Sequence, residues 1–259
     1  MKKCFAVILA VVLLWGCTPA AEPKPTLPPS PYSPQDYQYQ DGFLTCSAGQ
    51  TVLGIDVSSH QGQIDWQQVA DAGITFAIIR LGNRGYATGQ LNEDAYAHSN
   101  LSGAMAAGIL VGAYFYSQAI SAEEAKEEAE FALKILGEET LDLPLVYDWE
   151  YVSETARTAH VSRRTLTDCT LTFCQTVETA GYDSMVYFNT AQATDLLHLQ
   201  ELTQYPWWLA MYDITQDFPC QVDMWQYTHT GTVPGVQGNV DVNLLFAQWG
   251  LGAELLEMK

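Results

Sequence analysis

The chain is poor in positive charge: 11 lysines and arginines stand against 30 aspartates and glutamates among 259 residues, a formal net charge of -19. Nucleic acids and other polyanions repel such a chain at long range, so we expect no nucleic-acid partner and favour a neutral substrate. Solubility alone would also account for the charge. Hydrophobic residues make up 48% and charged residues 16% of the chain, which indicates a packed globular protein.

The sequence also lacks the spacings of a metal site. Its five histidines are scattered without a His-x-x-x-His pair, and no Cys-x-x-Cys motif occurs. We therefore expect no catalytic metal and no cofactor, which argues against a metal-dependent sugar deacetylase.

Cysteine is scarce in the region expected to fold, where only Cys46, Cys169, Cys174 and Cys220 occur. An exported chain could pair them as disulfides. Cys169 and Cys174 lie five residues apart in a predicted helix, which turns them about 140° from each other and argues against a bond between these two. Buried free thiols are an equal alternative.

Long apolar runs are missing except for a short one near the N-terminus, from Phe5 to Trp15. It follows two lysines and is too short to span a bilayer, which is typical of a secretion signal. The run ends in Leu-Trp-Gly-Cys17, which resembles a bacterial lipobox. We predict a lipoprotein-type signal peptide over residues 1–17, with lipidation of Cys17; an ordinary signal peptide cleaved nearby is the alternative. The protein is then exported and anchored to the outer face of the bacterial cell membrane, or secreted.

Proline is concentrated after this signal, with seven of the eleven prolines between Pro19 and Pro34. Proline fixes φ and cannot donate to a sheet, so such a stretch is extended and semi-rigid. We predict a Pro-rich tether over residues 18–48 and a single folded domain over residues 49–259.

The folded region alternates apolar β-type runs with helical stretches. Strands are predicted over 52–57, 76–81, 109–116, 143–147, 185–188, 207–212 and 224–227, with helices over 66–72, 94–108, 121–136, 162–181 and 191–202. This alternation predicts a mainly parallel sheet in an α/β fold, and the number of units favours a barrel. In such barrels, catalytic groups lie where strands end and loops begin.

The strongest local signal is Leu-Val-Tyr-Asp148-Trp-Glu150. Side chains alternate along a strand, so Asp148 and Glu150 point the same way, about 6.6 Å apart. Their mutual repulsion, with Tyr147, Trp149 and Tyr151 as a partly apolar surround, would raise one pKa and leave the other group ionised. Glycoside hydrolysis needs one protonated acid and one anion of this kind. Two solvated acids at a strand end are the alternative.

Further polar and aromatic residues also follow apolar runs. Asp56 ends the first strand and could be a catalytic anion, a substrate acceptor or a turn residue, and Asp241 lies in a final Val-Asp-Val segment. Sugar rings stack on aromatic side chains, although any single aromatic could instead belong to the core. The side chains predicted to bind substrate are Arg80, Tyr116, Tyr187, Tyr212 and Gln226.

Five segments together resemble glycoside hydrolase family 25, the lysozymes that cleave β-1,4 bonds after N-acetylmuramic acid. They are GIDVSSHQGQIDW at 54–66, FAIIRLGNRGY at 76–86, LVYDWEY at 145–151, PWWLAMYD at 206–213 and MWQYTHTGTVPGVQGNVDVN at 224–243. They occur in the family's order and span nearly all of 54–250. The resemblance implies an irregular, TIM-like (β/α) barrel with fewer helices than the regular eightfold barrel.

The resemblance also implies roles for the acids. Glu150 matches the general acid, Asp148 matches the carboxylate that steadies the substrate's 2-acetamido group, and Asp56 and Asp241 match two further catalytic-pocket acids. One departure lies at 80–86, where many members carry an acid and this chain reads RLGNRGY. The departure affects the expected sugar and peptide contacts, not the carboxylate core.

Two functions follow from these observations. The first is an active muramidase, whose partners are peptidoglycan glycan strands and, through Cys17, a membrane; we expect it to be a monomer. The second is a non-catalytic glycan-binding lipoprotein of the cell envelope. The intact Asp148 and Glu150 pair favours the enzyme, because a decayed enzyme is expected to lose one of its acids.

Overall fold

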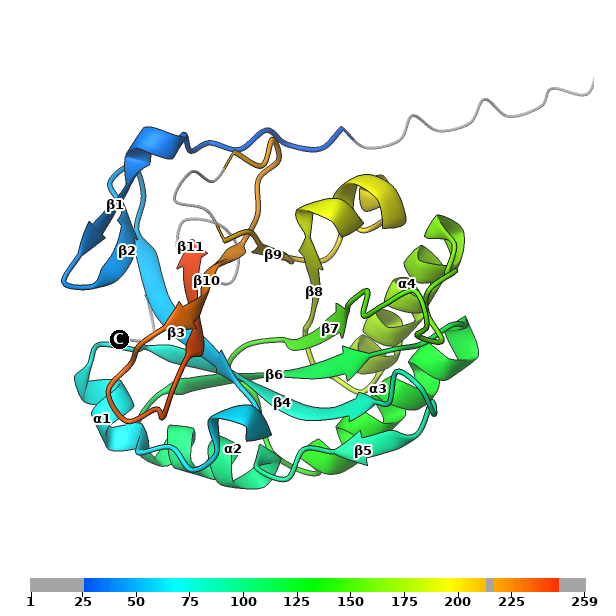
Figure 1. Ribbon diagram of the computed structural model, residues 1–259, viewed down its shortest axis with the longest axis horizontal. Helices are drawn as coiled ribbons and strands as arrows, with labels where there is room; N and C mark the ends of the chain where they lie inside the picture. The colour runs from blue at the N-terminus through cyan, green and yellow to red at the C-terminus, as the bar shows by residue number, and fades with distance from the viewer. Residues whose placement is uncertain (1–25, 213–216, 247–259) are drawn as a thin grey trace, which may run out of the picture.

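The computed structural model describes residues 26–212 and 217–246, and they form a closed, mixed β-barrel with few helices around it (Figure 1). The predicted signal peptide, Cys17 and the first part of the predicted tether lie outside the described residues. None of the helices in the described residues is long and apolar enough to cross a bilayer.

Eight strands close the barrel: β3 (Thr51–Val57), β4 (Phe76–Arg84), β6 (Leu110–Ser117), β7 (Leu145–Trp149), β8 (Ser184–Asn189), β9 (Trp207–Ala210), β10 (Met224–Gly231) and β11 (Val240–Phe246). They follow one another in this order around the barrel, and β11 closes it against β3. Neighbouring strands are parallel except for β11, which is antiparallel to both β10 and β3. The predicted irregular α/β barrel is confirmed. The short strand β5 (Leu91–Glu93), which we did not predict, pairs with the end of β4 and lengthens it beyond the predicted bounds.

In the described residues, four α-helices accompany the barrel: α1 (Trp66–Asp71), α2 (Ala97–Ala106), α3 (Ala122–Leu136) and α4 (Arg163–Thr179). Ser121 caps the start of α3, since its side chain accepts a hydrogen bond from the Glu124 amide. Figure 1 shows the helices along the bottom and right of the barrel. Helices α3 and α4 lie where the sequence predicts them, because in each of them the apolar face and the capping residue indicate the same segment.

The predicted helix over 191–202 is wrong in kind. The chain forms a π-type turn over Gln192–Leu196 and a separate 3-10 turn over Leu199–Glu201. The Gln192 side chain turns inward, where its Oε1 accepts a hydrogen bond from the Asn189 amide at 2.8 Å and its Nε2 donates to the Trp149 carbonyl. These bonds hold the start of the segment against the ends of β8 and β7, and a widened turn accommodates them.

An N-terminal hairpin shortens the predicted tether. Strands β1 (Tyr37–Gln40) and β2 (Phe43–Cys46) pair antiparallel around Asp41 and Gly42, whose φ values of 51° and 89° are those of a tight hairpin turn. The Tyr37 ring packs edge-on against Trp225 at 4.9 Å, and the hairpin joins the main core. The folded body therefore begins before residue 49, because apolar side chains of this segment are buried against the outside of the barrel.

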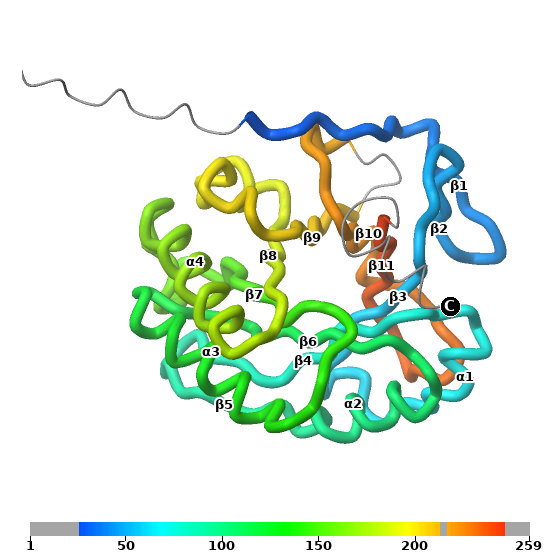
Figure 2. The backbone as a smooth tube through the Cα atoms, turned by 180° about the vertical axis from the view of Figure 1, so that it is seen from behind, coloured from blue at the N-terminus to red at the C-terminus, as the bar shows by residue number. Residues whose placement is uncertain are grey.

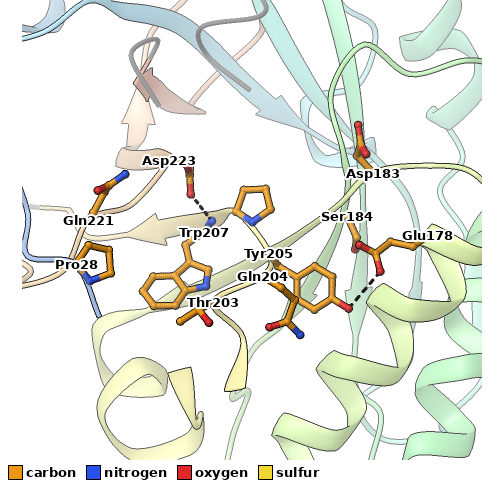
Figure 3. A pocket seen from close by; sticks show the side chains of 11 residues that line it. Pro28, Glu178, Asp183, Ser184, Thr203, Gln204, Tyr205, Trp207, Gln221 and Asp223 are labelled. Atoms are coloured by element: carbon orange, nitrogen blue, oxygen red, sulfur yellow. Dashed lines mark hydrogen bonds between the residues drawn. The ribbon is translucent and has the colours of Figure 1, made fainter. Parts of the chain in front are cut away.

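The described chain reaches this hairpin along one end of the barrel. The Pro28 carbonyl accepts a hydrogen bond from the Gln221 amide at 2.9 Å, and the Ser30 amide donates to the Pro219 carbonyl at 3.0 Å. Figures 1 and 2 both show this N-terminal segment beside the loop that precedes β10. A pocket of about 470 Å³ opens here, lined by Pro28 and by residues at the starts of β8, β9 and β10: Ser184, Trp207 and Asp223 (Figure 3).

The interior of the barrel is apolar below the strand ends. Its largest buried side chains include Phe76, Ile78, Trp208 and Met224. The polar side chains at the carboxyl ends of the strands therefore lie against the apolar interior of the barrel. On α4, Cys169 and Cys174 are buried free thiols, and Cys46 and Cys220 are also free.

Candidate active site

A cavity of about 600 Å³ opens at the carboxyl ends of the barrel strands. All nine side chains that the sequence predicted for the site line it: Asp56, Asp148, Glu150, Asp241, Arg80, Tyr116, Tyr187, Tyr212 and Gln226. Trp208, Tyr114 and Tyr86, which were not among the side chains predicted to bind substrate, line the same cavity. Closure of the barrel brings together residues of the first and last barrel strands, which lie far apart in the chain.

Asp148 lies on β7, and Glu150 follows directly after that strand. Asp148 is 6% exposed, and its buried Oδ1 has no hydrogen-bond partner among the described residues. Burial, followed by the charge of Glu150, raises the pKa of Asp148 well above its usual value, while the charge of Arg80 opposes the shift. Burial also raises the pKa of Glu150, and the nearby Tyr187 hydroxyl opposes this shift. The cavity therefore raises the pKa of both groups, whereas the sequence predicts that only one of the two is raised.

The apolar surround of this pair differs from the predicted one. Tyr147 and Trp149 alternate with Asp148 along β7, so they lie on its outer face, in the core shared with the helices. The cavity walls come instead from neighbouring strands and supply Tyr114, Tyr116, Tyr187 and Trp208. The strand alternation that turns the two acids toward the cavity turns the side chains next to them on the strand away from it.

Asp56 and Asp241 form a second acidic pair. They lie directly opposite each other across the antiparallel strands β3 and β11. Burial, together with the charge of Asp241, raises the pKa of Asp56 well above its usual value, and burial raises the pKa of Asp241. Two carboxyls placed opposite each other, one buried and one half-buried, favour sharing one proton between them.

Amide side chains hold Asp56 in place. Its Oδ2 accepts hydrogen bonds from Gln226 Nε2 at 2.8 Å and from Asn243 Nδ2 at 2.9 Å. Gln226 Oε1 in turn accepts from the hydroxyls of Tyr187 at 3.1 Å and Tyr212 at 2.8 Å. We did not predict Asn243, although it lies two residues after Asp241 on β11 and alternation could have placed it on the same face.

Comparison with known proteins decides the family. The model for "Glycosyl hydrolases family 25" matches residues 55–236. The chain belongs to glycosyl hydrolase family 25. This family-25 chain is a glycoside hydrolase of the lysozyme class.

The relatives of this family-25 chain include proteins with and without an assigned activity. It is 31% identical over 213 residues to "Uncharacterized protein YegX" of Escherichia coli K12, covering 76% of this chain and 70% of the relative. It is 28% identical over 202 residues to "Lysozyme M1" of Streptomyces globisporus, covering 74% and 67%.

Solved structures agree with this family-25 assignment. The lysozyme from Streptomyces coelicolor matches with a TM-score of 0.64 and 26% identity over 80% of this chain and 96% of that one. The autolysin LytC from Streptococcus pneumoniae matches with a TM-score of 0.69 and 26% identity over 81% of this chain, which spans about half (52%) of that protein. A second structure of LytC holds a synthetic peptidoglycan ligand.

The 80–86 stretch, where this family-25 chain departs from the expected pattern, still contributes to the site. Arg80, Asn83 and Tyr86 all line the cavity. The Arg80 guanidinium donates to Asp94 Oδ2 at 2.7 Å and to Ser59 Oγ at 3.0 Å. The guanidinium is thus paired with Asp94, and its charge also acts on Asp148, where it opposes the rise in pKa. Within the described residues, no group of three or more potential ligands is arranged to hold a metal ion.

Proposed function

We propose that this lysozyme-class hydrolase cleaves the β-1,4 bond between N-acetylmuramic acid and N-acetylglucosamine in peptidoglycan, with Glu150 as the general acid. The observation that carries the proposal is the pair of carboxyl groups, buried Asp148 and half-buried Glu150, inside one cavity walled by aromatic side chains. The peptidoglycan ligand bound to the related LytC supports glycan strands as the partner. One chain supplies the whole cavity, so we propose that it acts as a monomer.

Glu150 is suited to deliver a proton to the leaving oxygen. Burial raises its pKa, so it holds a proton to a higher pH than a solvated glutamate would. The nearby Tyr187 hydroxyl lowers the pKa of Glu150 and so favours the carboxylate that remains after transfer. In the second half of the reaction the same carboxylate takes a proton from the attacking water.

Asp148 is suited to orient the substrate's own acetamido group. Its unpaired Oδ1 is an acceptor that the 2-acetamido N–H of the substrate would satisfy. The acetamido oxygen then attacks the anomeric carbon as the glycosidic bond breaks, and the leaving oxygen takes the Glu150 proton. Water later opens the resulting ring at the anomeric carbon. The substrate therefore supplies the nucleophile, an exception to the usual scheme of two carboxylates.

The remaining site residues are proposed to bind sugar. Asp56 and Asp241 present carboxyl oxygens to sugar hydroxyls, and Arg80 contributes positive charge at the same wall. Tyr116, Tyr187 and Tyr212 offer ring faces against which pyranose rings can stack. At 48% exposure, Tyr212 lies at the open edge of the cavity.

The product test uses purified peptidoglycan and mass analysis of its new reducing ends. We expect reducing ends at N-acetylmuramic acid. New reducing ends at N-acetylglucosamine would identify a glucosaminidase and contradict the proposed bond. Binding of glycan without any new ends would instead support the non-catalytic alternative.

We further propose that the protein is exported and held at the outer face of the cell membrane by lipidation of Cys17. The proline-rich stretch after Cys17 and an extracellular polymer as substrate support this placement. In membrane fractionation, the mature wild-type protein should partition with membranes, and Cys17→Ala should be neither processed nor anchored normally. An entirely soluble mature protein with a cleavage site elsewhere would contradict the anchor.

A further inference from the structure

The peptide that carries Glu150 is held from two sides by buried glutamine side chains. Gln118 Nε2 donates to the Glu150 carbonyl at 2.7 Å, and Gln192 Nε2 donates to the preceding carbonyl, that of Trp149. Both glutamines are almost fully buried, at 0% and 2% exposure. Two consecutive carbonyls at the end of β7 are therefore bound by side-chain amides.

Gln118 is itself fixed by its surroundings. Its Oε1 accepts from Thr158 Oγ1 at 2.9 Å, and its Nε2 also donates to the Ser117 carbonyl at 2.9 Å. Its own carbonyl accepts from Arg157 Nη1 at 2.7 Å. With both ends of the amide occupied, the side chain cannot rotate without losing hydrogen bonds in a buried site.

Gln192 is fixed in a comparable way at the end of β8. Its Oε1 accepts from the Asn189 amide at 2.8 Å, and its own amide donates to Asn189 Oδ1 at 2.9 Å. Gln118 follows directly after β6, and Gln192 lies just after β8, the two strands that flank β7 in the barrel. The Glu150 peptide is thus tied to the strand ends on both sides.

We propose that Gln118 and Gln192 are positioning residues that aim the Glu150 carboxyl at the leaving oxygen of the substrate. The inference rests on the proposed role of Glu150 as general acid. Glu150 lies beyond the last residue of β7, so side-chain amides rather than strand pairing fix its backbone. General acid catalysis depends on this placement, and a shift of about 1 Å can cost on the order of 10²-fold in rate.

The test compares two substrates in Gln118→Met, which keeps the side-chain length and removes both the oxygen and the nitrogen of the amide. One substrate is peptidoglycan; the other is a dinitrophenyl glycoside of the N-acetylglucosamine–N-acetylmuramic acid disaccharide, whose leaving group needs no proton. We expect kcat/KM on peptidoglycan to fall on the order of 10²-fold. We expect kcat/KM on the dinitrophenyl glycoside to fall only a few-fold, because this parameter ends at departure of the leaving group and no proton has to be delivered in that step.

Ser184→Ala is the matched control. It removes a buried hydrogen bond of 3.2 Å to the Leu145 carbonyl, at the opposite end of the same strand β7. It should leave the ratio of the two activities unchanged, even if the protein loses stability. The positioning role would be overturned if folded Gln118→Met lost activity equally on both substrates, or lost none on either, because the ratio of the two activities would then be unchanged.

Two further variants keep the result unambiguous. Gln192→Met removes the second amide and should shift the activity ratio in the same direction, which matters if Gln118→Met does not fold. An unchanged ratio in folded Gln192→Met would count against the proposal in that case. Glu150→Gln tests the general acid separately. If this variant stays active on peptidoglycan, the proposed function fails. If Glu150→Gln loses peptidoglycan cleavage as expected but both glutamine variants keep the wild-type activity ratio, only the positioning role is rejected.

Discussion

Glu150→Gln is expected to reduce cleavage of peptidoglycan by about 10²- to 10⁴-fold, because it removes the proton donor and keeps the shape of the side chain. The same variant should retain most of its kcat/KM on the dinitrophenyl glycoside, because this parameter ends at departure of the leaving group and does not include the later attack of water. Initial rates at substrate concentrations well below KM measure the effect on both substrates. The protein should fold and still bind glycan, since the change opens no cavity.

The wild-type pH profile provides a second measurement of the same group. Burial raises the pKa of Glu150, so activity on peptidoglycan should persist above the range of an ordinary glutamate and fall as the pH rises through the raised pKa. This fall in activity at higher pH should be absent from the profile of kcat/KM against pH for the dinitrophenyl glycoside. Near-normal cleavage of peptidoglycan by Glu150→Gln would reject the assignment and leave Asp56 or Asp241 as the next candidate acid.

Asp148→Asn is expected to abolish turnover of both substrates. The amide that replaces the carboxylate lacks the negative charge that favours attack by the acetamido oxygen, and this step is needed whatever the leaving group. Parallel assays with Glu150→Gln separate the two roles: one variant should lose both reactions, the other mainly one. Retention of activity on the dinitrophenyl glycoside by Asp148→Asn would contradict participation of the acetamido group.

The same substitution should stabilise the protein at neutral pH. Because the folded protein raises the pKa of Asp148, ionisation of this buried carboxyl weakens the folded state as the pH rises through that pKa. Below about pH 4, where an unfolded aspartate is also protonated, the difference in melting temperature from wild type should disappear. Asp183→Asn, at the opposite end of the barrel, is a matched control that should leave activity unchanged.

Local patterns in the sequence were sufficient for the barrel and for the acids of the site. Strand alternation places Asp148 and Glu150 on one side of their strand. The rule that catalytic groups of a barrel lie where strands end and loops begin places Asp56 and Asp241 at the same cavity. The hairpin was also within reach of the sequence. Asp41-Gly42 is a strong turn signal between two short alternating segments, but the neighbouring prolines dominated the interpretation of that region.

Other parts of the site have no local signature. Gln118 and Gln192 lie 32 and 43 residues from the carbonyls they bind, so only the folded chain reveals these contacts. The pKa directions are equally non-local, because Asp148 is affected by charges on β3, β4 and β11 as well as by Glu150. Burial within a closed barrel, rather than the neighbours in sequence, decides which groups hold protons.

The route of the N-terminal segment fixes how a tethered molecule would be oriented. Pro28 lies among the first residues of β8 and β9, whereas the carboxyl groups lie at the other ends of the parallel strands. A pull applied through the residues before 26 therefore acts on the closed base of the barrel. In an enzyme anchored through this segment, the opening of the active-site cavity would face away from the anchoring surface. Such an enzyme would cut glycan strands that approach from outside rather than strands that lie next to that surface.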